Sequence, residues 1–210
     1  MNAKYKPIAL YILEKYTDDI MMEAGFKRRC NSLNYSRTIG GAKQKLEMIC
    51  FSHPPYYAGS LLHIYPYMSV YFPEIHKVAE NMIDDVGDIT IRRPIKEKPF
   101  DSSQWLLMTD EKGEVDAIAE NIRIFLIQCI IPLFDDLKTI DDYIDKYEQH
   151  DERAYLCGTE AYFYVASAYV INGEYAKGLE VLNKRFVGPA IRKYHAKAFA
   201  YFEKKLGELE

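Results

Sequence analysis

Apolar positions in the first part of the chain change from a helical period to a strand period. Apolar side chains recur at helical spacing over residues 8–21, which predicts an N-terminal helix that ends at Gly25. From Phe26 the period falls to two, and Gly40-Gly41 can supply the positive φ of a tight turn before a second strand, QKLEMICF. The pattern therefore predicts a helix followed by a β-hairpin.

The segment LLHIYPYMSVYF alternates more regularly than any other. One face carries Leu62, Ile64, Met68, Val70 and Phe72, and the other carries His63, Tyr65, Tyr67, Ser69 and Tyr71. This alternation predicts a strand with a tyrosine-rich face. Pro66 predicts a sheet edge or a bulge at this strand, because proline cannot donate to a ladder.

The back half of the chain has a helical period from Glu114 onward, with Thr139 as the cap of a helix that begins near Asp141-Asp142. Short strand patterns precede it. The order predicts an α+β fold with an N-terminal helix, a mainly antiparallel sheet and a C-terminal helical bundle. We expect residues 1–112 to form the sheet region, and residues 113–210 to pack against it as one globular unit.

A helical hairpin is predicted near the C-terminus. The segment TEAYFYVASAYVINGEYAKGLEVLNKRFVGPA, which starts at Thr159, resembles one tetratricopeptide repeat, with Gly178 where alanine is usual. The chain has a single copy. Because such repeats bury their faces against neighbours, we expect this one to pack on its own domain rather than form a peptide groove.

Charge is distributed unevenly along a chain whose net charge is −4. A weakly acidic protein has no general attraction for polyanions, so a nucleic-acid role depends on a local basic patch. The candidate patch is Lys27, Arg28, Arg29 and Arg37. Strand alternation places Lys27 and Arg29 on one side and Arg28 on the other, which is typical of a soluble edge strand and unfavourable for a phosphate-binding stripe.

Catalytic and metal-binding patterns are missing from the sequence. Cys50 and His53 are the closest pair of zinc-ligand type, but a second close pair is absent, and the four cysteines contain no Cys-x-x-Cys. The acids at 135–145 alternate with apolar residues at helical spacing, which indicates a solvated helix face. Neither GxxxxGK[ST] nor GxGxxG occurs. We therefore predict no catalytic residue, metal or cofactor.

The chain is expected to be cytoplasmic, without a membrane partner. Its N-terminus lacks the pattern of a signal peptide. The most apolar run, IRIFLIQCIIPLF, is interrupted by Arg123, Gln128 and Pro132 and is shorter than the roughly 20 residues of a spanning helix.

Several short features together resemble a family of uncharacterised bacterial proteins known only as a domain of unknown function. The residues that carry the resemblance are Gly25, Phe26, Lys27, Arg28, Asn31, Tyr35, Trp105, Pro132 and Phe134. The resemblance implies a bacterial origin and a fold pattern of a helix, strands and a helical tail. It implies no catalytic residue.

Three functions remain as hypotheses. The first is a non-catalytic protein-binding module, immunity-like in class, that uses either the acidic segment 135–148 or the tyrosine face formed by His63, Tyr65, Tyr67 and Tyr71. The second is a nucleic-acid binder that uses the basic hairpin. The third is a small-ligand protein that uses the tyrosine face as a stacking platform, against the alternative that helices cover this face. The sequence does not predict an oligomeric state.

Overall fold

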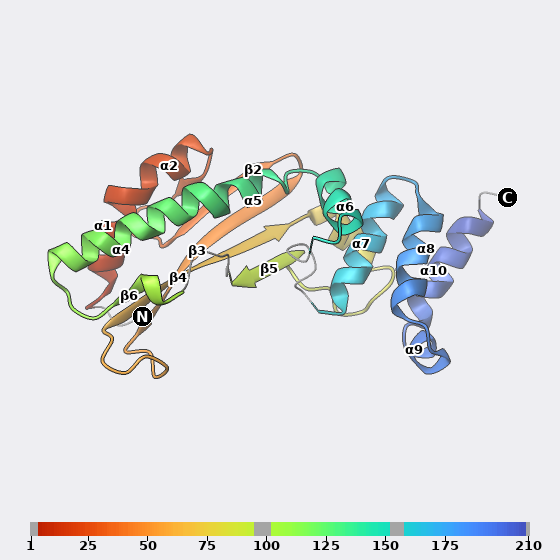
Figure 1. The fold of residues 1–210 in the computed structure, drawn as a ribbon. Helices are drawn as coiled ribbons and strands as arrows, with labels where there is room; N and C mark the ends of the chain where they lie inside the picture. Colours follow the sequence, from red (N-terminus) through yellow and green to blue (C-terminus); the bar gives the residue numbers. More distant parts are fainter. Residues whose placement is uncertain (1–3, 95–101, 152–157, 209–210) are drawn as a thin grey trace. The chain divides into compact units, whose positions relative to one another are not determined.

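The structure, a computed structural model, describes residues 4–94, 102–151 and 158–208. Its architecture is α+β, with an N-terminal helix, a sheet and then helices in the C-terminal half, as the periodicity predicts (Figure 1). A first compact unit comprises Met1–Arg37, Gln44–Met68 and Pro94–Asp136, and a second comprises Thr38–Lys43, Ser69–Arg93 and Leu137–Glu210. The predicted division at residue 112 stays a prediction.

The helices are α1 (Lys6–Ile12), α2 (Asp18–Glu23), α3 (Pro73–Ala79), α4 (Lys112–Phe125), α5 (Ile131–Asp135), α6 (Ile140–Glu148), α7 (Glu160–Ile171), α8 (Tyr175–Arg185), α9 (Pro189–Tyr194) and α10 (Ala196–Gly207). The strands are β1 (Lys27–Arg28), β2 (Asn34–Ile39), β3 (Ala42–Ser52), β4 (Leu62–Tyr71), β5 (Ile91–Pro94) and β6 (Leu106–Leu107). A π-helical turn, Leu13–Thr17, joins α1 to α2, and a second, Leu126–Ile130, joins α4 to α5.

The N-terminal helix ends where the sequence predicts. Gly25 adopts φ +82°, a left-handed conformation that suits glycine because it has no Cβ. The amide of Gly25 donates to the Met22 carbonyl and that of Phe26 to the Met21 carbonyl, both at 2.9 Å. These bonds close the last helical turn and direct the chain into β1.

The described strands pair in the order β1-β2-β3-β4-β5, and β6 also pairs with β4. Gly40 and Gly41 both have positive φ and form the predicted hairpin turn, but this turn joins β2 to β3. The expected single strand from Phe26 is therefore wrong. It breaks after Arg28, because Asn31 takes φ +61° and the Ser32 amide donates to the Arg29 carbonyl in a turn.

Strand β4 has the predicted alternation. Its apolar face is fully buried, whereas Tyr65, Tyr67 and Tyr71 on the other face are half-buried. Pro66 lies in β4, a central strand of the sheet, and not at an outer edge as predicted. On its N-terminal side, Leu62 and His63 pair with β6. On its C-terminal side, the Val70 carbonyl accepts from the Thr90 amide. A missing N–H is tolerated best in such a gap between pairing segments.

The apolar run of the middle region lies in one helical segment of 24 residues, Lys112–Asp135. The π-helical turn ends at Ile130, two residues before Pro132, so an irregular turn lies on the N-terminal side of the residue that cannot donate a helical bond. Among the described residues this is the one helix long and apolar enough to cross a membrane, and a core helix of a soluble protein has the same length and composition.

The second unit contains a helical hairpin formed by α7 and α8. Gly178 of α8 explains one departure from the repeat pattern. A Cβ at this position would lie 2.8 Å from the Phe202 ring of α10 and 3.0 Å from the Ala166 carbonyl of α7. Glycine therefore allows α8 to lie close to both neighbours.

The Thr139 cap of α6 is confirmed, since its hydroxyl accepts from the Asp142 amide at 3.1 Å.

A buried histidine in this unit predicts acid sensitivity. His76 stacks on Tyr164 at 4.5 Å between ring centroids and shares a 2.8 Å hydrogen bond with Thr90 Oγ1. Burial lowers the pKa of His76 below its ordinary 6.5. The unfolded chain therefore binds the proton first, and the free energy of unfolding should fall as the pH drops below about 6.5 and level off below the folded pKa.

His76→Gln should make this decline shallower without abolishing it, because burial also lowers the pKa of His195. Urea unfolding followed by circular dichroism between about pH 7 and pH 5 measures the slope. His150→Asn is the control, since His150 is exposed and its φ of +56° suits asparagine. An unchanged slope in His76→Gln would contradict the prediction.

Candidate functional site

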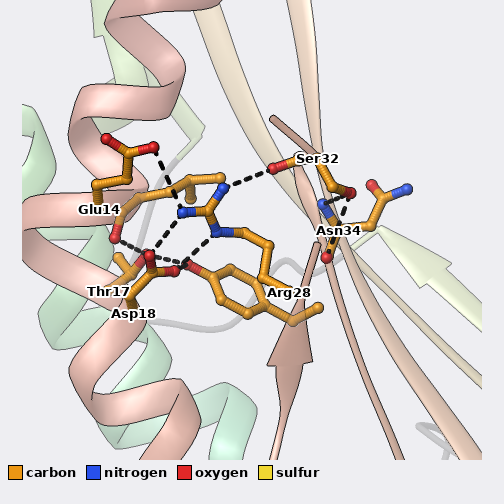
Figure 2. A network of polar contacts seen from close by, with 8 residues as sticks. Glu14, Thr17, Asp18, Arg28, Ser32 and Asn34 are labelled. Atoms are coloured by element: carbon orange, nitrogen blue, oxygen red, sulfur yellow. Dashed lines mark hydrogen bonds and ion pairs between the residues drawn. The ribbon is translucent and has the colours of Figure 1, made fainter. Parts of the chain in front are cut away.

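Arg28 of the predicted basic patch lies in β1, in a polar network between the N-terminal helix and the strands (Figure 2). Its guanidinium donates to both carboxylate oxygens of Asp18, at 2.8 and 2.6 Å, and to the Ser32 carbonyl at 3.0 Å. Tyr35 donates to the same Asp18 carboxylate at 2.6 Å and shares a 2.8 Å bond with Thr17. Burial opposes ionisation of Asp18, but the bonds from Arg28 and Tyr35 outweigh it and lower its pKa.

Arg37 is also engaged inside the first unit. It donates to Gln44 at 2.6 Å, to the Ala24 carbonyl at 2.5 Å and to Asp135 at 2.8 Å. Its guanidinium lies 4.4 Å from the centre of the Phe26 ring. Gln44 in turn donates to the Phe134 carbonyl at 2.7 Å. This arginine thus ties the end of α2, strands β2 and β3, and α5 together.

Burial of these two arginines divides the predicted basic patch. The side chains of Arg28 and Arg37 are 9% and 6% exposed, and their donors are used by the contacts above. Lys27 and Arg29 remain exposed. A phosphate-binding surface needs several accessible cations, and two of the four residues of the predicted patch remain accessible.

The tyrosine face is distributed over both units. His63, Tyr65 and Tyr67 belong to the first unit. Tyr71 belongs to the second, where its ring contacts His76 at 4.6 Å and Lys43 lies 5.6 Å from its centre. In the first unit, the helices α1–α2 and α4–α5 pack along the strands (Figure 1), and Gln44 donates to the Phe134 carbonyl of α5. The Trp105 ring lies 4.8 Å from Phe125 of α4 and 5.9 Å from Tyr65, so Tyr65 is in contact with a buried ring.

An aromatic cluster surrounds His63 at the end of this face. Its members are Phe51, Tyr56, Tyr57, His63 and Tyr65, and the four rings around His63 have centroids 5.5–6.4 Å from it. Tyr56 shares a 3.0 Å hydrogen bond with His63 Nδ1. Burial raises the pKa of Tyr56, so its phenol is neutral and can donate. His63 itself is buried, while Phe51 and Tyr56 are 45% and 55% exposed.

The loop that presents Tyr56 and Tyr57 is held at its base. His53 shares a 3.0 Å bond with the Tyr5 hydroxyl, and its amide donates to the Leu61 carbonyl. The Leu61 amide donates to Leu107, in β6. His53 has φ +47°, a strained conformation that folded proteins keep where the surroundings determine it. The aromatic cluster is therefore presented by a defined loop.

Met108 extends the exposed apolar surface beside this loop. It is 50% exposed, and its terminal methyl would lie 3.7 Å from a Cβ added at Gly59, so it is next to this loop. Alternation in the sequence predicted His63 and Tyr65 as members of one face, but it did not single out Phe51 or Met108. Phe51 could have been recognised, because alternation along β3 places it opposite the buried Leu46 and Met48. Met108 could not, since its position depends on the pairing of β6 with β4.

Cys50 precedes Phe51 in β3. Burial raises the pKa of Cys50 to about 12, so this thiol is protonated at neutral pH. Cys30 and Cys50 are free thiols, and Cys157 lies outside the described residues. Within the part of the chain that the structure describes, no three His, Cys, Asp or Glu side chains come together as metal ligands. The site offers apolar contact, stacking and phenolic hydrogen bonds.

No family model, curated protein or solved structure matches the chain. The resemblance to a family of uncharacterised bacterial proteins stays a prediction.

Proposed function

We propose that the chain is a non-catalytic protein-binding module whose contact surface is the aromatic cluster together with Met108. The observation that carries the proposal is the exposure of Phe51, at the end of β3, and of Tyr56, on the loop that follows, with ring centroids 6.4 Å apart, while the exposed Met108 lies beside Gly59 of the same loop. Large apolar groups gathered on a soluble surface mark interaction sites. Tyrosine is also enriched among residues that dominate binding energy.

The local charge favours a protein over a nucleic acid as partner. On β3, beside the cluster, Lys45 pairs with Glu47 at 2.8 Å, so this part of the strand is close to neutral. The two most buried arginines of the hairpin are already engaged by Asp18 and Asp135. Phosphate recognition depends on accessible cations, whereas a protein interface needs a desolvated apolar centre with a polar rim.

The test compares partner recovery by three tagged proteins from a lysate of the source cells. The wild type and Met22→Ser should recover one stoichiometric partner, since Met22 is exposed on α2. The double variant Phe51→Ser/Tyr56→Ser should lose it, because truncating two central anchors costs at least about 30-fold in affinity. Unchanged circular dichroism would show that the double variant is folded.

Two outcomes would overturn the proposal. One is a partner that the double variant retains, and the other is recovery of only the free protein. Titration with single- and double-stranded oligonucleotides at low and moderate salt tests the nucleic-acid alternative, which requires a steep salt dependence. Binding that Lys27→Ser/Arg29→Ser removes would favour that alternative.

A further inference from the structure

The second unit contains a cavity of about 580 Å³. Three segments line it: residues 82–85 after α3, the start of α7, and the junction of α9 with α10. This volume lies within the range of sites that hold small molecules or single side chains. The aromatic cluster contributes nothing to its lining, so the cavity is a separate site.

One wall of the cavity is aromatic. His195 lies 5.0 Å from Phe163 and 4.8 Å from Tyr194, measured between ring centroids, and its far side packs on Phe186 at 4.4 Å. Burial lowers the pKa of His195, so the ring is neutral at pH 7. Tyr194 is 81% exposed. Phe163 and Phe186 are buried behind His195, so the wall presents the Tyr194 ring without a positive charge beside it, and an aromatic face of this kind attracts cations.

Acidic residues also line the cavity. Asp84, Asp85 and Glu160 line the cavity with a single amine, Lys197. Lys197 is engaged by Asp84 at 2.5 Å and by the Glu80 carbonyl at 3.2 Å. Among the described residues, Asp85 and Glu160 have no ion pair, so two carboxylates remain for a ligand. Since no third ligand group joins them there, they do not form a metal site.

We propose that this cavity binds an arginine side chain of a partner peptide whose neighbouring residues are apolar. A guanidinium is planar and stacks on aromatic faces while it donates to carboxylates. Tyr194 supplies the exposed face, and Asp85 and Glu160 supply the acceptors. Val187 and Ile191 are 75% and 40% exposed in the same α8–α9 region, and they provide apolar contact for the flanking residues.

The probe is the blocked pentapeptide acetyl-Leu-Ala-Arg-Ala-Leu-amide, with a twin that carries citrulline, the neutral isostere of arginine. Titration of the full chain is followed by calorimetry and by amide chemical shifts. We expect the arginine peptide to shift Glu160, Tyr194 and Lys197. It should bind about tenfold more tightly than its twin, and more weakly as salt is raised.

Variants separate this site from the rest of the protein. Asp85→Asn/Glu160→Gln should weaken binding of the arginine peptide about tenfold, and Tyr194→Ala about threefold. Glu74→Gln, an exposed carboxylate on α3 outside the cavity, should bind like the wild type. Equal affinity for the citrulline twin, unchanged binding by the double variant, or no binding would overturn the proposal. Phe51→Ser/Tyr56→Ser should retain the peptide, so the two proposals fail independently.

Discussion

Replacing Arg28 with methionine should lower the free energy of unfolding of the first unit by about 2–3 kcal/mol. The variant leaves Asp18, partly buried in the network of Figure 2, with only Tyr35 as a side-chain donor. Removing one partner of a buried charged pair destabilises more than the pair itself contributes, because the remaining charge is poorly solvated. The estimate lies below that for a fully buried pair, since the Asp18 side chain is 23% exposed.

The measurement is urea unfolding followed by the fluorescence of Trp105. This lone tryptophan is fully buried in the first unit and therefore reports on the unit that contains Arg28. Arg29→Met is the matched control. It removes the neighbouring exposed arginine and should change stability by no more than about 0.5 kcal/mol. Equal effects of the two variants would show that the network contributes little.

Acid provides a second readout of the same network. The pKa of Asp18 lies below its ordinary 3.8 because the Arg28 and Tyr35 bonds outweigh burial. The unfolded chain therefore takes up the proton first, so this contribution is present above about pH 4 and is lost as the pH falls through the folded pKa. The advantage of the wild type over Arg28→Met should shrink in that range.

The sequence predicted elements whose local pattern was decisive. Gly25 ends the first helix, Thr139 caps α6, and alternation assigns the two faces of β4. Each of these features depends on neighbouring residues, so periodicity and cap chemistry were sufficient. The α+β class followed from the order of such segments.

The partners of the basic residues Arg28 and Arg37 could not be predicted from local patterns. Alternation correctly separates Lys27 from Arg28, but it does not show that Asp18, ten residues earlier, meets Arg28. Arg37 is further from its partner in sequence, since Asp135 lies 98 residues away. A charged side chain near a turn has the same local pattern whether it faces solvent or a carboxylate from another element. Only tertiary packing decides between a patch and an internal cross-link.

Arg37→Met should cost about 2–4 kcal/mol, because it removes the hydrogen bonds from Arg37 to three acceptors at once. Gln44 is buried, and its carbonyl oxygen accepts from Arg37, as do the Ala24 carbonyl and Asp135. Arg37→Lys should lie between methionine and the wild type, since one ammonium cannot reproduce the fork of a guanidinium. Urea unfolding followed by Trp105 fluorescence again measures the change.

A double-mutant cycle with Gln44→Leu isolates the central contact. Gln44→Leu alone breaks the bonds to Arg37 and to the Phe134 carbonyl, and the double variant should lose less than the sum of the two single losses. We expect a coupling of about 1 kcal/mol or more, as for residues in one hydrogen-bond network. Lys27→Met is the control for removing a basic side chain from the same sheet, because Lys27 is exposed. Strict additivity would show that Arg37 stabilises the first unit through Asp135 and Phe26 instead. The contact between Arg37 and Asp135 of α5 would then matter more than the contact between Arg37 and Gln44 of β3.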